Sequence, residues 1–215
     1  MNPTASLAPA EAVEMEERSR RIVETAVELA EQGGFEAVRL RDVAAHAGVA
    51  LGTLYRRFHS KEDLLVAALD RETRDLERRV IRRPPRGETE LDRVLSLFST
   101  ATRGLLRRPN LARALLRAAA CGEPGLAGRV GAFHERVERM IVFCLRGGGS
   151  ALVEDTEIAV SATVEESQLA YALNMIWFAL LVGWSGGQHS ESALIEKMGV
   201  SAELVLRGAA GNGSC

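Results

Sequence analysis

Basic, hydroxyl and aromatic side chains are concentrated between Arg39 and Lys61, a segment in which Asp42 is the single acidic residue. Guanidinium and ammonium groups bind phosphate oxygens, as does a tyrosine hydroxyl, and a threonine can meet a base edge through its hydroxyl or its methyl group. This combination of residue types is typical of a surface that binds DNA. The residues that we expect to contact DNA are Arg39, Arg41, Ala50, Leu51, Gly52, Thr53, Tyr55, Arg56, His59 and Lys61.

Two short helices joined by a tight turn would position these side chains. The first helix has an apolar face at helical spacing, made of Leu40, Val43, Ala44 and Ala47. Gly48 then stands where a helix would end, because glycine adopts a positive φ without strain. The apolar pattern continues in the second helix at Leu54, Tyr55 and Phe58. The pattern predicts a helix-turn-helix, whose second helix enters the DNA major groove.

Three further features support this interpretation. Gly52 lies inside the second helix, where glycine costs about 1 kcal/mol relative to alanine, and a helix without a side chain at that point permits close approach of another surface. Ser60 is followed three residues later by Asp63, a spacing that resembles a capping box at the start of a third helix. Lys61 falls in the first turn of that helix, where backbone N–H groups can bind phosphate.

The segment from Val49 to Leu65, V-A-L-G-T-L-Y-R-R-F-H-S-K-E-D-L-L, resembles the recognition helix and the following helix of TetR-type transcriptional regulators. The likeness reaches back to Gly34-Phe35-Glu36-Ala37. The resemblance implies an all-α protein, with an N-terminal three-helix DNA-binding domain that contains the helix-turn-helix and a C-terminal helical domain for ligand binding and dimerisation. It also implies a homodimer that binds palindromic operator DNA, most often as a repressor released by a small-molecule effector.

The segment departs from the family pattern in three places. Arg39 replaces the usual capping threonine or serine, and His59 replaces a frequent proline. Ala50 and Leu51 stand where serine and another polar residue are common. Arg39 and the Ala50-Leu51 pair lie at or near the expected DNA surface, so they favour an operator preference unlike that of better-known members.

Glycine and proline breaks divide the rest of the chain. We expect a disordered arm at 1–13, a DNA-binding domain at 14–60, a ligand-binding and dimerisation domain at 61–207 and a disordered tail at 208–215. Gly33-Gly34 ends the first helix, and Arg82-Arg83-Pro84-Pro85-Arg86-Gly87 ends the helix that links the domains. Further helices are predicted at 88–107, 110–121, 124–146, 165–184 and 191–207, with a loop or helical turn at 153–163.

The helix predicted at 165–184 is the most apolar. Its run from Leu169 to Val182 is shorter than the roughly 20 residues that a membrane span requires, so no membrane association is expected. Apolar residues surround this helix on every side. One side would therefore face the domain core and another a partner subunit.

Composition bears on other classes of function. The formal net charge is −2, so any DNA site must be a local basic patch. Cys121, Cys144 and Cys215 are widely spaced without a C-x-x-C pair, which favours neither a disulfide framework nor a zinc site. We recognise no signal peptide in the sequence. We also recognise no nucleophile motif, no phosphate-binding loop and no histidines at the spacing of metal ligands. We expect a cytoplasmic protein that is not an enzyme and has no cofactor.

A pocket for a hydrophobic effector is expected in the C-terminal domain. The candidate lining residues are Phe98, Leu105, Leu116, Phe133, Val137, Met140, Asn174, Trp177 and Phe178. The alternative is that these side chains simply fill the core. Asn174 stands out, because an amide in so apolar a helix needs a hydrogen-bond partner. His134 and Glu138, one helical turn apart, are interpreted as a surface pair.

A second resemblance narrows the effector class. The run V-A-L-G-T-L-Y-R and the apolar helix around Trp177 and Trp184 are similar to those of TetR-type repressors that control sterol and lipid degradation in actinobacteria. This resemblance implies a steroid or a fatty acyl-CoA as effector. Two other classes stay open at this point. One is a small helical enzyme acting on a lipid-like substrate, against which the missing acid–base or metal constellation argues. The other is a DNA-binding protein with a fully packed core and no effector.

Overall fold

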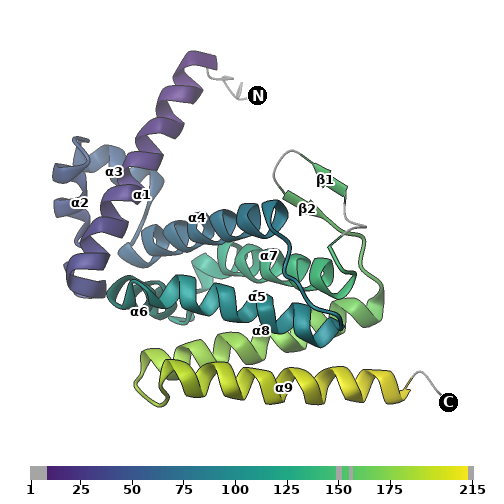
Figure 1. Ribbon diagram of the computed structural model, residues 1–215. Coiled ribbons are helices and arrows are strands. Elements are labelled where there is room, and N and C mark those ends of the chain that lie inside the picture. Colours follow the sequence, from purple (N-terminus) through teal and green to yellow (C-terminus); the bar gives the residue numbers. More distant parts are fainter. Residues whose placement is uncertain (1–8, 149–151, 155–156, 213–215) are drawn as a thin grey trace.

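The computed structural model describes residues 9–148, 152–154 and 157–212. Its regular elements are helices apart from one small hairpin (Figure 1). The elements are α1 (Pro9–Ala37), α2 (Leu40–His46), α3 (Leu51–Arg57), α4 (Lys61–Arg82), α5 (Glu90–Leu106), α6 (Pro109–Ala119), a 3₁₀ turn (Pro124–Leu126), α7 (Ala127–Leu145), β1 (Leu152–Glu154), β2 (Glu157–Ala159), α8 (Val164–Ser185) and α9 (Glu191–Asn212). The expected all-α class is confirmed.

Helices α1, α2 and α3 form a head at one end of the molecule, and α4 runs from this head into a body of longer helices (Figure 1). In the body, α6 and α7 pack against α4, while α8 and α9 lie side by side along one face (Figure 1). The buried apolar residues of head and body belong to one continuous core. The head is therefore seated on the body by side-chain packing, which fixes where its DNA-facing surface points.

Both ends of the described chain are more helical than the sequence pattern predicts. Helix α1 begins at Pro9 and takes in residues 9–13, which the pattern assigns to the arm. Proline fits the first turn of a helix because the N–H that it lacks would have no intrahelical acceptor there. Helix α9 continues to Asn212 and takes in the first residues of the expected tail. The break expected at Gly33-Gly34 is confirmed, since Gly34 has a φ of 68° and neither glycine is helical.

The loop or helical turn expected at 153–163 is wrong, because the segment contains an antiparallel hairpin with Val153 opposite Ile158. Ile158 is 1% exposed, and its backbone N–H donates a hydrogen bond to Glu77 Oε1 of α4 at 3.0 Å. Arg136 Nη1 of α7 donates to Glu77 Oε2 at 2.5 Å and to Glu157 Oε1 at 3.1 Å. A buried carboxylate of α4 thus satisfies both the hairpin backbone and an arginine of α7, which holds the hairpin on the body.

Helix α8 begins with a capping box in which Thr163 and Glu166 each accept a hydrogen bond from the other's backbone. Arg146 pairs with the Glu166 carboxylate at 2.6 Å. The hydrogen bond from this guanidinium is the main cause that lowers the pKa of Glu166 to about 2. The 22-residue α8 has a mean hydropathy of 1.3 over its most apolar window, so by length and composition alone it meets the criterion for a membrane-crossing helix. Core helices meet the same criterion, and 33% of that window is buried within this chain.

Arg93 of α5 closes the C-terminal end of α7. Its Nε and Nη2 donate hydrogen bonds to the carbonyl oxygens of Cys144 at 2.8 Å and of Leu145 at 2.9 Å. Its Nη1 also donates to the carbonyl oxygens of Gly87 and Glu88, both at 3.4 Å. Unpaired carbonyls at a helix end carry partial negative charge, so a guanidinium is favourable there. Arg93 therefore ties the loop after α4 to α7.

Replacing Arg93 with glutamine is expected to lower the free energy of unfolding by about 1.5–3 kcal/mol, the usual contribution of hydrogen bonds to a charged group. The matched control is Arg103→Gln, which removes an exposed arginine from the same helix. Urea denaturation at one fixed protein concentration measures both variants. Equal losses of unfolding free energy in the two variants would contradict the role given to Arg93.

Candidate nucleic-acid interface

The turn between α2 and α3 has the geometry that a glycine allows. Gly48 has a φ of 65°, and its N–H donates a hydrogen bond to the carbonyl oxygen of Ala45 at 3.3 Å. The N–H of Val49 donates to the carbonyl oxygen of Ala44 at 3.0 Å. The helix-turn-helix expected between Leu40 and Phe58 is confirmed.

Buried side chains fix the orientation of α3. Leu54 is 0% exposed and Phe58 is 3% exposed, and both belong to the core that Val43 of α2 and Ile22 of α1 share. Because side chains on a helix point outward in all directions, burying Leu54 turns the opposite face of α3 away from the chain.

The outward face of α3 carries Gly52, Tyr55 and Arg56, all of them exposed. Arg56 Nη2 donates a hydrogen bond to Thr53 Oγ1 at 3.0 Å, so these two polar side chains are held next to each other. A Cβ added to Gly52 would meet no atom within 4 Å. Packing within the chain therefore gives no reason for a glycine at this position.

Four other candidate DNA contacts lie around the starts of α2 and α3. Arg39, Arg41 and Ala50 are exposed, whereas Leu51 is partly buried against the core. Only part of the Leu51 side chain is therefore open to a base. Neither Arg39 nor Ala50 caps its helix through a side chain. The first backbone N–H groups of both helices are left without a side-chain acceptor from the capping residue.

The start of α4 connects the head to the body. Ser60 Oγ accepts a hydrogen bond from the Asp63 N–H at 3.0 Å, as the sequence predicts. The Asp63 carboxylate accepts from the His59 N–H at 2.9 Å, one residue before the position that a capping box requires. Asp63 is 5% exposed and also pairs with Arg129 of α7 at 2.9 Å. Sequence reasoning missed this link because nothing local connects residues 63 and 129. The His59 side chain is exposed.

Lys61 is engaged within the chain. Its ammonium lies 3.9 Å from the centroid of the Phe35 ring and 3.3 Å from the Glu36 carboxylate. Arg117 of α6 contacts the same ring at 3.9 Å and the same carboxylate at 3.0 Å. The hydrogen bond from Lys61 is the main cause that lowers the pKa of Glu36. Lys61 must leave this cluster to reach a DNA phosphate.

Most residues expected to line an effector pocket are buried together in the body. Seven of the nine are between 0% and 4% exposed, namely Phe98, Leu116, Phe133, Val137, Met140, Asn174 and Trp177. Leu105 and Phe178 are partly buried against the same core. The indole N–H of Trp177 donates a hydrogen bond to Thr102 Oγ1 at 2.9 Å, and the Trp177 ring lies 5.5 Å from that of Phe98. Phe98 and Thr102 also line a cavity of about 340 Å³ between α5 and α9.

Asn174 is 0% exposed and finds its partners on α7. Its Nδ2 lies 3.1 Å from His134 Nδ1 and donates to Glu138 Oε1 at 3.2 Å, while its Oδ1 is buried without a hydrogen-bond partner. The interpretation of His134 and Glu138 as a surface pair is wrong, because both are half-buried against α8. Burial lowers the pKa of His134 and raises the pKa of Glu138. Across the described ranges, no group of three or more His, Cys, Asp or Glu residues is arranged to hold a metal ion.

Comparison with known proteins matches both parts of the chain. Residues 22–68 match the family described as bacterial regulatory proteins, tetR family, and residues 87–204 match the tetracyclin repressor-like C-terminal domain. The HTH-type transcriptional repressor KstR of Rhodococcus jostii is 33% identical over 190 residues, which span 88% of this chain and 83% of KstR.

Solved structures share the fold. A TetR transcriptional regulator from Rhodococcus sp. RHA1 is 27% identical, with a TM-score of 0.74 over 89% of this chain and 96% of that one. FadR from Bacillus subtilis, solved with stearoyl-CoA, is 20% identical, with a TM-score of 0.60 over 86% and 96% of the two chains. FadR from Thermus thermophilus, solved with lauroyl-CoA, is 22% identical, with a TM-score of 0.62 over 88% and 94%.

Because burial lowers the pKa of His134 below its ordinary value of 6.5, the unfolded chain binds a proton at this position more readily than the folded chain. Stability from this effect is present above about pH 6.5 and is lost as the pH falls through the folded pKa. Thermal unfolding measured across this pH range should show that the melting temperature of His134→Gln falls less with decreasing pH than that of the wild type. The control is His59→Gln, since the His59 side chain is 85% exposed. The prediction fails if all three proteins share one pH dependence.

Proposed function

This chain belongs to the TetR family of bacterial regulatory proteins, and we propose that it represses transcription by binding palindromic operator DNA as a homodimer in the cytoplasm. It is a transcriptional regulator and not an enzyme. In this proposal, residues 14–60 bind DNA, residues 61–207 bind effector and partner subunit, and a hydrophobic effector releases the operator.

The outward face of α3 is the observation that carries the DNA-binding proposal. Gly52 leaves the helix backbone bare on this face, and nothing in the chain occupies the space that a side chain would take. A bare backbone lets the helix approach the floor of the major groove closely. Thr53 and Arg56 would then read bases together with Ala50 and the open part of Leu51. The remaining contacts would position the helix on phosphates, through Arg39, Arg41, Tyr55, His59 and Lys61.

Exposed apolar side chains on α8 and α9 support the homodimer. Tyr171 of α8 is 59% exposed, and Val200 and Leu204 of α9 are 56% and 65% exposed. The two helices lie side by side on one face of the body (Figure 1). Large apolar side chains exposed on two neighbouring helices are costly in water and indicate an interaction site. Pairing this face with its own copy about a twofold axis would give two heads that match a palindromic operator.

The cavity between α5 and α9 supports a hydrophobic effector. Its volume of about 340 Å³ lies in the range of small-molecule pockets, roughly 300–1,000 Å³. Phe98 and Thr102 form part of its wall and contact Trp177 directly. An effector that reaches further inward must displace these side chains, because Phe98, Thr102 and Trp177 are all buried. The steroid or acyl-CoA class follows from the resemblance to repressors of lipid degradation, and two FadR proteins of this fold were solved with acyl-CoA.

Displacing Phe98 or Trp177 would repack the core on which α4 lies, and α4 carries the head. The effector then favours a head position that does not fit the operator, as in any ligand-driven population shift. A coupling free energy of about 1–3 kcal/mol between the two sites is enough for a switch.

Gly52→Ala separates DNA binding from folding. In the free protein the new methyl group has room and removes the helix penalty of glycine, so the free energy of unfolding should rise by up to about 1 kcal/mol. Operator affinity should fall at least tenfold, because the methyl group would meet DNA. The control is Gly104→Ala, which adds a methyl group to open space in α5, outside the head. Fluorescence anisotropy measures the affinity, and equal affinities for the two variants would contradict the proposed interface.

Effector release is tested by titrating the protein–operator complex with long-chain acyl-CoA and with steroid CoA thioesters. At least one ligand class should lower operator affinity about tenfold, which corresponds to roughly 1.4 kcal/mol of coupling. Thr102→Val should change the ligand concentration that is needed, because Thr102 lines the α5–α9 cavity. If no ligand of either class changes operator affinity or melting temperature, the chain is an effector-independent DNA-binding protein.

A further inference from the structure

Few buried polar side-chain atoms in the part of the chain that the structure describes lack a hydrogen-bond partner. They are Nη1 of Arg71, Nε of Arg136 and Oδ1 of Asn174. Such atoms are uncommon in folded proteins, and each one indicates a partner that the chain itself does not supply. The two arginines differ from Asn174, because both already pair with carboxylates of the chain.

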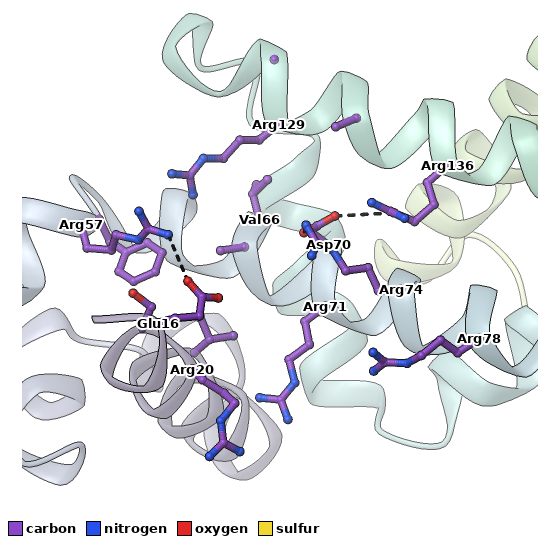
Figure 2. Close-up of a pocket in the computed structure, with 16 residues that line it drawn as sticks. Glu16, Arg20, Arg57, Val66, Asp70, Arg71, Arg74, Arg78, Arg129 and Arg136 are labelled. Atoms are coloured by element: carbon purple, nitrogen blue, oxygen red, sulfur yellow. Dashed lines mark ion pairs between the residues drawn. The ribbon is translucent and has the colours of Figure 1, made fainter. Parts of the chain in front are cut away.

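Both arginines line a hollow of about 640 Å³ between head and body (Figure 2). Carboxylates of the chain balance all the guanidinium groups in its walls. The pairs are Arg20 with Glu17 and Glu24, Arg57 with Glu16, Arg71 with Glu24, Arg74 with Asp70, Arg78 with Asp75, Arg129 with Asp63, and Arg136 with Asp70, Glu77 and Glu157. This hollow therefore has no excess of positive charge to attract a ligand. The unmatched atom of Asn174 has no such explanation.

The side-chain amide of Asn174 turns its nitrogen toward α7. Its Nδ2 lies 3.1 Å from His134 Nδ1, 3.4 Å from the His134 carbonyl oxygen and 3.2 Å from Glu138 Oε1. A carbonyl oxygen only accepts hydrogen bonds, and so does an ionised carboxylate. The amide must therefore present its NH₂ group to these atoms, which leaves Oδ1 without them. The unmatched atom is an acceptor, so its partner must be a donor.

Aromatic side chains surround this polar cluster. The centroid of the His134 ring lies 4.8 Å from that of Phe133 and 5.0 Å from that of Phe178. Trp177, one turn beyond Asn174 on α8, is 4% exposed. A hydroxyl group on an apolar molecule suits such a place, because the hydroxyl supplies the donor and the rest of the molecule packs against apolar side chains.

Asn174 lies on α8 between the borders of two hollows. Trp177, one turn later, contacts Phe98 and Thr102, which line the α5–α9 cavity. Ala170, one turn earlier, lines a smaller hollow of about 220 Å³ beside α7. Residues three or four positions apart share one face of a helix. An effector that enters the α5–α9 cavity and displaces the Trp177 ring would therefore meet Asn174 next.

We propose that Asn174 determines the specificity of the effector site, by accepting at Oδ1 a hydrogen bond from a hydroxyl group on an otherwise apolar effector. This inference rests on the proposed effector-responsive repressor and names the chemical class of its effector. A ketone at the same place would put its own oxygen against Oδ1, where two acceptors repel each other. An unsubstituted carbon would leave Oδ1 unmatched. The effector is therefore a hydroxylated lipid.

Two matched series of probes test this preference. One consists of androstanol, androstanone and androstane, and the other of hydroxystearate, oxostearate and stearate, with the substituent on the same carbon within a series. Binding to the full chain is followed by the fluorescence of Trp177 and Trp184, its two tryptophans. At least one hydroxyl probe should bind about tenfold more tightly than its ketone and its unsubstituted parent, since a site that hydrogen-bonds a hydroxyl discriminates against analogues without it.

Asn174→Leu replaces the amide with an apolar side chain of similar size. The affinities for the hydroxyl and ketone probes should then agree within about twofold, because the acceptor is gone. The control is Gln168→Leu, which makes the same kind of change at an exposed position of α8 and should keep the wild-type ratio of affinities. A purely structural role for Asn174 would weaken the binding of all probes alike and leave the ratio unchanged.

Three results overturn the proposal. In the first, neither hydroxyl probe shows saturable binding to the wild type. In the second, each ketone binds as tightly as its hydroxyl partner, as expected if water already satisfies Oδ1. In the third, the preference for the hydroxyl survives in Asn174→Leu. If Asn174→Leu does not fold, the ratio measured on the wild type decides by itself.

Anisotropy with operator DNA separates this inference from the repressor proposal. The preferred hydroxyl probe should lower operator affinity about tenfold, within the usual range of coupling between two sites. A hydroxyl probe that binds with the expected preference and leaves operator affinity unchanged would refute the effector role of Asn174. If the wild type itself binds no DNA specifically, the repressor proposal fails, and the fluorescence titrations still decide whether Asn174 selects a hydroxyl group.

Discussion

The position of the head depends on α4, which belongs to the cores of both head and body, and on the packing of α1 against α6. Two buried carboxylates attach α4 to α7 near both of its ends, Asp63 through Arg129 and Glu77 through Arg136. Leu64, Leu65 and Ala68 between them are fully buried. Ion pairs of buried carboxylates fix geometry more reliably than they add stability. A change in packing against α7 must therefore move α4, and with α4 the recognition helix.

A second connection runs from α6 to the turn after α1. Arg117 and Lys61 lie against the same phenylalanine ring and share the Glu36 carboxylate. Through side-chain contacts alone, this cluster joins α6 and α4 to the head. A DNA phosphate that drew Lys61 away from Glu36 would leave Arg117 as the remaining partner of this carboxylate. Lys61 thus links the two sets of contacts, because the same side chain pairs with Glu36 inside the chain and would bind a DNA phosphate.

Local pattern was enough to predict the helix-turn-helix, because its glycine turn, its buried residues and its serine cap all lie within 24 residues, from Leu40 to Asp63. The hairpin could not be predicted in this way. It depends on the Glu77 carboxylate, which meets the Ile158 backbone 81 positions later in the chain. Asn174 was identified as an amide in need of partners, but only the packing of α7 on α8 places His134 and Glu138 beside it. The apolar composition of the expected pocket could not distinguish a cavity from a filled core.

The central claim is that the exposed face of α3 recognises a particular DNA sequence. Fluorescence anisotropy across a salt series tests it most directly, with DNA from upstream of the protein's own gene, DNA selected from a random library and unselected random DNA. The account predicts binding to an upstream or selected sequence at least about 10³-fold tighter than to random DNA. It also predicts a steep linear fall of log affinity with log salt, because phosphate contacts release counterions. Equal, weak binding to all three kinds of DNA, with no sequence enriched by selection, would contradict the account.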